Sequence, residues 1–207
     1  MTTRVVMLHG LWMPAAAMRW LAARLAESGY VPELFAYHSI LGGIEATEAR
    51  LAACLARQPC HVVAHSLGGL VALETLSHQP ELPVARVVCL GTPLCGSGAA
   101  ESLRRWPLVP LWTGRSGGLL QRGCTTWPAT LEVAMIAGRV PRGLGALFAG
   151  FEGEHDGTVA VAETRLPALA DHAVVDASHS GLLFSRAAAR LATAFLAEGR
   201  FAAAASV

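Results

Sequence analysis

Short apolar runs alternate along the chain with longer amphipathic stretches. Strands are predicted where the runs are apolar, over 4–8, 31–36, 61–64, 86–90, 133–137 and 172–176. Helices are predicted where apolar residues recur every three or four positions, over 14–28, 44–57, 67–78 and 182–198. This alternation is typical of a mainly parallel six-stranded sheet with helices on both faces. Because no linker or repeat is visible, we expect one α/β domain over residues 1–207.

One segment, residues 94–130, breaks the alternation. It contains glycine, proline and arginine and holds three of the five tryptophans, Trp106, Trp112 and Trp127. Long irregular connections often act as lids or binding loops, so we expect a lid-like insertion here. Trp106 and Trp112 would then line or cover a substrate pocket, since such pockets are mainly apolar. The alternative is a surface excursion that encloses its own small apolar cluster.

Composition excludes several classes of protein. Of the 207 residues, 53% are hydrophobic and only 15% are charged, which is too apolar for a disordered chain. The formal net charge of +1 argues against a nucleic-acid partner. All 16 cationic side chains are arginine. Without lysine there is no Walker A loop and no lysine Schiff base, and therefore no pyridoxal phosphate chemistry.

The apolar runs are too short for a membrane or secretory segment. No run of 18 residues is continuously apolar, and the first run covers only residues 5–8, with no small-residue cleavage site after it. The five cysteines are odd in number and form no CxxC pair, so we expect neither a zinc site nor a disulfide framework. These features favour a cytoplasmic protein with free thiols and no metal or cofactor.

The segment from Val62 to Gly69 carries the clearest chemical signal. A buried strand runs into Ser66, and a helix follows, which is the pattern of a nucleophile elbow. The sharp turn requires small residues two positions before and after the serine, and Ala64 and Gly68 meet this requirement. The amide of Leu67 would lie at a helix N-terminus and could bind an oxyanion. The alternative is a serine that merely caps a helix.

A second oxyanion donor is expected from the loop after the first strand. His9 and Gly10 follow residues 5–8 directly, and loops in this position supply such donors in acyl-transfer sites. Leu11 N–H is our candidate and Trp12 is the alternative. We also place Trp12 beside the substrate. His9 is expected to hold the loop by a hydrogen bond rather than to act as a base.

Five segments together resemble the α/β-hydrolases, and among them the small bacterial lipases and esterases. They lie at residues 9–10, 64–69, 90–93, 156–159 and 178–183, in the order of that family. In the family the His-Gly loop follows the third strand, whereas here it begins near residue 9. The resemblance therefore implies a reduced, six-stranded core. It also implies cleavage of carboxylic esters through an acyl-enzyme, without a metal, and the chain order serine, acid, histidine.

Within that fold the base must follow the last strand, which selects His179. His172 begins the same strand and belongs at its far end, while His155 lies on the loop expected to carry the acid. Ser66 would attack the ester carbonyl, and His179 would take its proton and return it to the leaving alcohol.

Asp156 is the expected acid, because its loop follows the fifth strand and ends at the same edge of the sheet as Ser66. Asp171 precedes the sixth strand and belongs at the opposite edge. Asp176 is three residues before His179, an arrangement that the family order does not use. Weaker alternatives are Glu154 and Glu163. Asp156 could instead form only an Asx turn before Gly157.

The leading hypothesis is thus a serine hydrolase of small-molecule or lipid esters with an apolar acyl or alcohol part. An acyltransferase or a thioesterase would use the same three residues, and the sequence does not distinguish these activities. A non-catalytic interaction protein on a hydrolase scaffold is disfavoured because every required group is present. The sequence predicts no oligomeric state.

Overall fold

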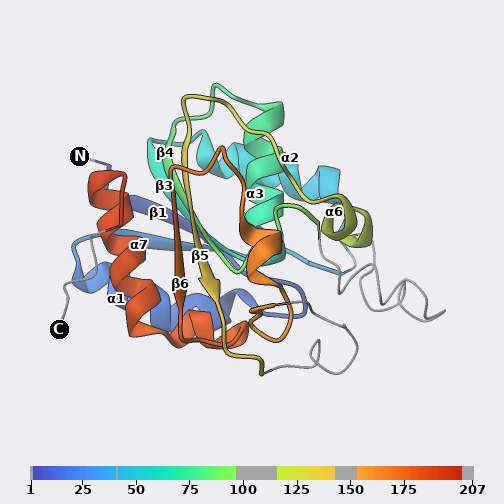
Figure 1. The fold of residues 1–207 in the computed structure, drawn as a ribbon. Helices are drawn as coiled ribbons and strands as arrows, with labels where there is room; N and C mark the ends of the chain where they lie inside the picture. Colours follow the sequence, from blue (N-terminus) through green and yellow to red (C-terminus); the bar gives the residue numbers. More distant parts are fainter. Residues whose placement is uncertain (1, 41, 97–115, 143–152, 202–207) are drawn as a thin grey trace.

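The computed structural model describes residues 2–40, 42–96, 116–142 and 153–201. Its centre is a six-stranded sheet in the order β2-β1-β3-β4-β5-β6, and every neighbouring pair is parallel (Figure 1). The strands are β1 (Arg4–Leu8), β2 (Val31–Phe35), β3 (Cys60–His65), β4 (Val84–Leu90), β5 (Glu132–Gly138) and β6 (Asp171–Val175). This sheet confirms the predicted α/β fold.

Helices cover both faces of the sheet. One face carries α1 (Arg19–Glu27) and α7 (Arg186–Glu198), and the other carries α2 (Ile44–Leu55), α3 (Leu67–His78) and α6 (Gly117–Arg122). Short 3-10 turns lie at η1 (Ala15–Met18), η4 (Val161–Thr164) and η5 (Ser180–Phe184).

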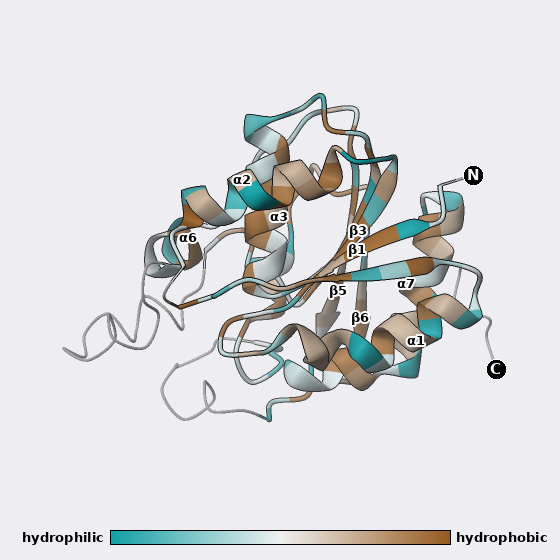
Figure 2. Cartoon of the chain, turned by 180° about the vertical axis from the view of Figure 1, so that it is seen from behind, coloured by the Kyte–Doolittle hydropathy of each residue, from teal (hydrophilic) through white to brown (hydrophobic). Residues whose placement is uncertain are grey.

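The two faces of the sheet form two apolar cores. In β1, Val6 and Leu8 face the layer of α2 and α3, whereas Val5 and Met7 face α1 and α7. All four side chains are fully buried, as expected for a parallel strand that is covered on both sides. Figure 2 shows the resulting hydrophobic colour along most of β1, with a hydrophilic segment only at the end nearer the N-terminus.

The predicted elements are present, with shifts at their ends. The helix predicted over 14–28 is split into η1 and α1, after Pro14, whose extended backbone precedes the first turn. The helix predicted from 182 begins at Arg186, because the Ser185 side chain caps it by accepting a hydrogen bond from the Ala188 amide. Helix α6 was not predicted, since its sequence begins with two glycines. The rest of the predicted lid, residues 97–115, lies outside the described residues.

All five cysteines lie in the described ranges, and none of them forms a disulfide. Burial raises the pKa of the Cys60 thiol to about 11 and that of Cys89 to about 12. These two thiols are therefore protonated at neutral pH and behave as small apolar core residues.

His9, His61 and His65 are buried and His172 is partly buried, and each is held in its neutral form. Desolvation lowers the pKa of His9, His61, His65 and His172, to about 3 for His65 and about 4 for His172. An unfolded chain would bind a proton at each of these positions near pH 6.5. Folding therefore excludes protons that the unfolded chain takes up, and the free energy of unfolding falls as the pH drops below this value.

We accordingly predict a loss of stability between pH 6.5 and pH 5. Urea unfolding at several pH values should give a free energy that decreases on acidification, by up to about 1.4 kcal/mol per pH unit for each excluded proton. His172→Gln should show a smaller decrease than the wild type, because one such site is removed. A free energy of unfolding that is constant over this pH range would contradict the burial of neutral histidines.

Candidate active site

Ser66 lies at a strained turn between β3 and α3. Its backbone has φ 54° and ψ −123°, and only Trp12 among the other described non-glycine residues also has positive φ. Such a conformation persists only where neighbours fix it. Here the Ser66 amide donates to the Leu90 carbonyl at 2.8 Å, and the Ser66 carbonyl accepts from the Gly69 amide and the Thr92 hydroxyl, each at 3.0 Å.

The space around this turn admits only small residues. A Cβ atom on Gly68 would lie 2.6 Å from the His9 carbonyl oxygen, and one on Gly69 would lie 2.1 Å from the Thr92 hydroxyl. Ala64 is fully buried in β3, where it pairs with Leu8 of β1 and Cys89 of β4. The steric requirement inferred from the sequence therefore has a direct structural cause.

Three polar side chains that are far apart in sequence form one hydrogen-bonded row at the carboxyl edge of the sheet. His179 Nε2 lies 2.9 Å from Ser66 Oγ, and His179 Nδ1 lies 2.7 Å from Asp156 Oδ2. The carboxylate accepts from Nδ1–H, so the lone pair of Nε2 faces the serine hydroxyl. The row can thus remove the proton of Ser66 and hold the resulting imidazolium cation.

Asp156 is fixed by its own loop. Its carboxylate is 1% exposed, and Oδ1 accepts hydrogen bonds from the amides of Thr158 at 2.9 Å and Val159 at 2.8 Å. Its main-chain carbonyl accepts from the His179 amide at 2.9 Å. The Asx-type turn and the contact with the imidazole therefore coexist, because each uses a different carboxylate oxygen.

The alternative carboxylates have other contacts. Asp171 lies at the start of β6 and accepts from the amides of His172 and Phe201. Asp176 has 74% of its side chain exposed and accepts from Arg139 Nε at 2.6 Å. This hydrogen bond holds the pKa of the Asp176 carboxyl below its ordinary value.

The other candidate acids and the two candidate bases considered beside His179 also make their contacts away from Ser66. Glu154 lies 3.7 Å from Arg139, and Glu163 accepts from the Ala160 amide. His155 Nδ1 accepts from the Gly157 amide, and His172 Nε2 lies 2.9 Å from the Thr164 hydroxyl. None of these four contacts involves Ser66 or the imidazole of His179.

The loop expected to supply the second oxyanion donor lies against the serine. A Cβ atom on Gly10 would lie 3.1 Å from Ser66 Cβ. The buried His9 donates from Nδ1 to the Gly10 carbonyl at 2.9 Å, as a loop-holding residue would. The amides of Leu11 and Leu67 have no hydrogen-bond acceptor among the described residues, whereas the Trp12 amide donates to Ser39 Oγ at 3.2 Å. This difference favours Leu11 over Trp12 as the donor.

Two residues that lie close to the hydrogen-bonded row, His65 beside His179 and Gly138 beside Asp156, were missed by the sequence reasoning. His65 Nε2 donates to the His179 carbonyl at 2.9 Å, and the two rings lie 4.7 Å apart. Gly138 was also missed; a Cβ atom there would lie 2.9 Å from Asp156 Cβ. The position of His65 directly before the serine was the only available signal, and Gly138 carried none.

Of the three tryptophans predicted to contact substrate, only Trp12 can be located. Its side chain is 50% exposed on the loop beside Ser66. Trp106 and Trp112 lie outside the described residues. Trp127, from the same predicted insertion, packs against the core on the α3 side.

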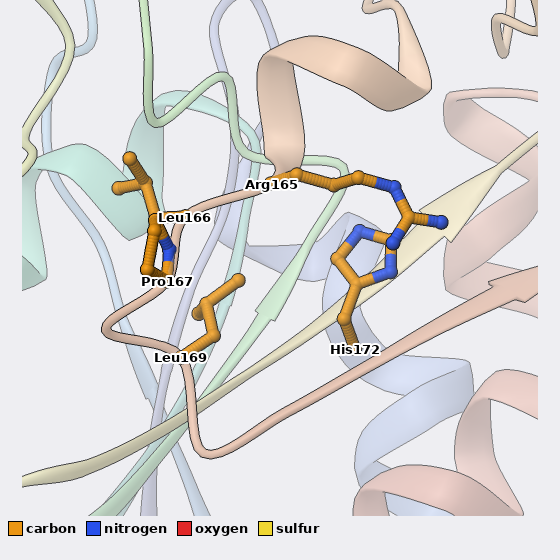
Figure 3. A pocket seen from close by; sticks show the side chains of 5 residues that line it. All are labelled: Arg165, Leu166, Pro167, Leu169 and His172. Carbon is orange, nitrogen blue, oxygen red and sulfur yellow. The ribbon is translucent and has the colours of Figure 1, made fainter.

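A separate hollow of about 240 Å³ lies near the start of β6, at the opposite end of the strand from His179. It is lined by Arg165, Leu166, Pro167, Leu169 and His172 (Figure 3). The described ranges contain no cluster of three histidine, cysteine or acidic side chains that could hold a metal ion. No helix within them is long and apolar enough to cross a membrane.

The crowding at the elbow gives a direct prediction for Ala64→Val. The added methyl groups would press on Leu8 and Cys89 and shift the turn that carries Ser66, at a cost of roughly 1–3 kcal/mol. We expect any reaction that Ser66 carries out to slow by more than the loss of stability, measured as the fall in melting temperature, would account for. Wild-type turnover in the purified variant would show that the turn is not tightly packed.

Comparison with known proteins identifies the family and the fold of this chain. Residues 5–203 match the sequence model of the alpha/beta hydrolase family. The mature form of the Bacillus licheniformis lipase BlEst2 has a similar structure, with a TM-score of 0.78 and 21% identity over 97% of this chain and 93% of the lipase. No curated protein sequence matches the chain.

Two further solved structures share the fold at lower similarity. The metagenomic carboxyl esterase MGS0156 has a TM-score of 0.61 and 19% identity, over 85% of this chain and 64% of the esterase. The pyrethroid hydrolase PytH has a TM-score of 0.64 and 12% identity, over 96% of this chain and 99% of the hydrolase. With the family match across nearly its whole length, the chain belongs to the alpha/beta hydrolase family.

Proposed function

We propose that the protein is a serine hydrolase that cleaves carboxylic esters through an acyl-enzyme. The observation that carries this proposal is the unbroken row from Asp156 through His179 to Ser66, with distances of 2.7 and 2.9 Å. A nucleophile, a base within reach of its proton and a carboxylate that orients the base are the three parts that this chemistry requires.

In the proposed reaction Ser66 Oγ attacks the ester carbonyl carbon while its proton passes to His179 Nε2. The imidazolium formed is stabilised by Asp156. Its proton then goes to the leaving alcohol as the acyl–serine ester forms. Water repeats the sequence, giving its proton to His179 and releasing the acid. The amides of Leu11 and Leu67 hold the oxyanion, and each donor contributes on the order of 3 kcal/mol to lowering the barrier.

An ester with an apolar acyl or alcohol part is the proposed substrate. The exposed indole of Trp12 and the partly buried Leu11 supply apolar surface beside the serine. Solved structures of the same fold include a lipase and a carboxyl esterase. Their names support an ester substrate for this chain without specifying the acyl length.

Hydrolysis of p-nitrophenyl esters from acetate to decanoate tests this proposal. Wild-type protein should release p-nitrophenol, and Ser66→Ala should lose at least about a thousandfold in kcat, as expected when a nucleophile is removed. Ser28→Ala is the matched control, because Ser28 is an exposed residue at the end of α1. Equal activity in the Ser66 variant would refute the proposal. Cleavage of acyl thioesters with no cleavage of the oxygen esters would reassign the substrate class.

The acid is tested by comparing Asp156→Asn with Asp176→Asn. The first change should turn the imidazole into the wrong tautomer and reduce kcat by about 10²–10⁴, with the fold retained. The second removes only a surface ion pair with Arg139, and activity should stay within about twofold. Inactivation by Asp176→Asn, with near-normal turnover in Asp156→Asn, would overturn the assignment of the acid.

A further inference from the structure

The segment that leaves β2 holds both ends of the loop over residues 9–12. The Tyr37 hydroxyl donates to the His9 carbonyl at 2.7 Å, and its ring stacks on the His9 imidazole at 4.4 Å. Ser39 Oγ accepts from the Trp12 amide at 3.2 Å. Tyr37 and Ser39 are 8% and 7% exposed, so both of these side chains are largely shielded from water. The Leu11 amide lies between the two points of attachment.

The end of the loop held by Ser39 is the strained one. Trp12 has φ 58°, a region that bulky residues rarely occupy. Among described non-glycine residues only Ser66 shares this feature, and such outliers cluster at functional sites. A backbone in this conformation relaxes unless neighbouring groups hold it, and Ser39 supplies such a contact.

Ser39 is itself fixed from a third element. Ser116 is 1% exposed and immediately precedes α6; its hydroxyl donates to the Ser39 carbonyl at 2.7 Å. A chain of two hydrogen bonds therefore connects the start of α6, through Ser39, to the backbone of Trp12. Ser39 thus contacts the loop through its side chain while Ser116 holds its main-chain carbonyl in place.

We propose that Ser39 is a positioning residue for the oxyanion loop. By holding the Trp12 amide, Ser39 Oγ fixes the strained turn and keeps the preceding Leu11 N–H directed at the carbonyl oxygen of the substrate. This inference rests on the proposed function, because it concerns stabilisation of the oxyanion during ester cleavage. Ser39 does not touch the reacting atoms and acts through the loop alone.

The test compares Ser39→Ala with Ser39→Thr, measuring kcat, KM and the inhibition constant of an alkylboronic acid. The boronate forms a tetrahedral adduct on the serine and reports on oxyanion binding. Ser39→Ala should lower kcat and weaken boronate binding in parallel, on the order of 10- to 100-fold, less than the loss for complete removal of a donor. KM should change by less than about threefold, because ground-state binding is largely unaffected. Ser39→Thr keeps the acceptor oxygen and should restore most of both losses.

Two variants keep the test decisive. Ser39→Cys keeps nearly the same side-chain size but replaces the hydroxyl with a weak hydrogen-bond acceptor, so it should show the same losses as Ser39→Ala. It replaces the alanine variant in the test where that variant does not fold. Ser116→Ala should cause a smaller loss of the same kind. Wild-type kcat and boronate affinity in a folded Ser39→Ala or Ser39→Cys protein would overturn the proposal, as would losses that threonine does not restore. Absence of ester cleavage by the wild type would instead refute the proposed function, before any Ser39 variant is compared.

Discussion

Close packing around the turn at Ser66 is the constraint on which the rest of the site depends. The start of α3 lies against the end of β1, and the missing side chain of Gly68 leaves only enough room for the His9 carbonyl. The same turn is bonded to Leu90 at the end of β4. Three neighbouring strands of the sheet, β1, β3 and β4, therefore determine where the serine lies and how close the loop over residues 9–12 comes to it.

Electrostatics around the imidazole follow from burial. Asp156 has little contact with water, and its carboxylate oxygens take three N–H donors, from the His179 ring and from the amides of Thr158 and Val159. The neighbouring His65 is neutral, because burial and the proximity of His179 lower the pKa of His65 to about 3. His65 therefore adds no positive charge beside the imidazolium that forms when Ser66 gives up its proton. Asp156 thus stabilises that cation, and the neighbouring His65 does not repel it.

The sequence was sufficient for the fold, because apolar runs mark the strands. It was also sufficient for the row of three side chains, because Ser66 and His179 lie just past the ends of β3 and β6 and the family order places the acid between them, on the loop from β5 to β6 that carries Asp156. The roles of Tyr37, Ser39 and Ser116 could not be predicted in this way. They are ordinary residues without a motif, and their contacts with the loop or with one another span 28, 27 and 77 positions. Helix α6 was missed because its contacts with α3, rather than its glycine-rich start, stabilise it.

The central claim, that Ser66 is the activated nucleophile, is tested most directly by a fluorophosphonate probe. The folded protein is incubated with the probe, digested, and the modified peptide is identified by mass spectrometry. We expect one adduct on Ser66, formed rapidly in the wild type, greatly slowed in His179→Ala and absent from protein unfolded in urea before the probe is added. An adduct on Ser178 or Ser180, or folded wild-type protein that does not react, would contradict this claim.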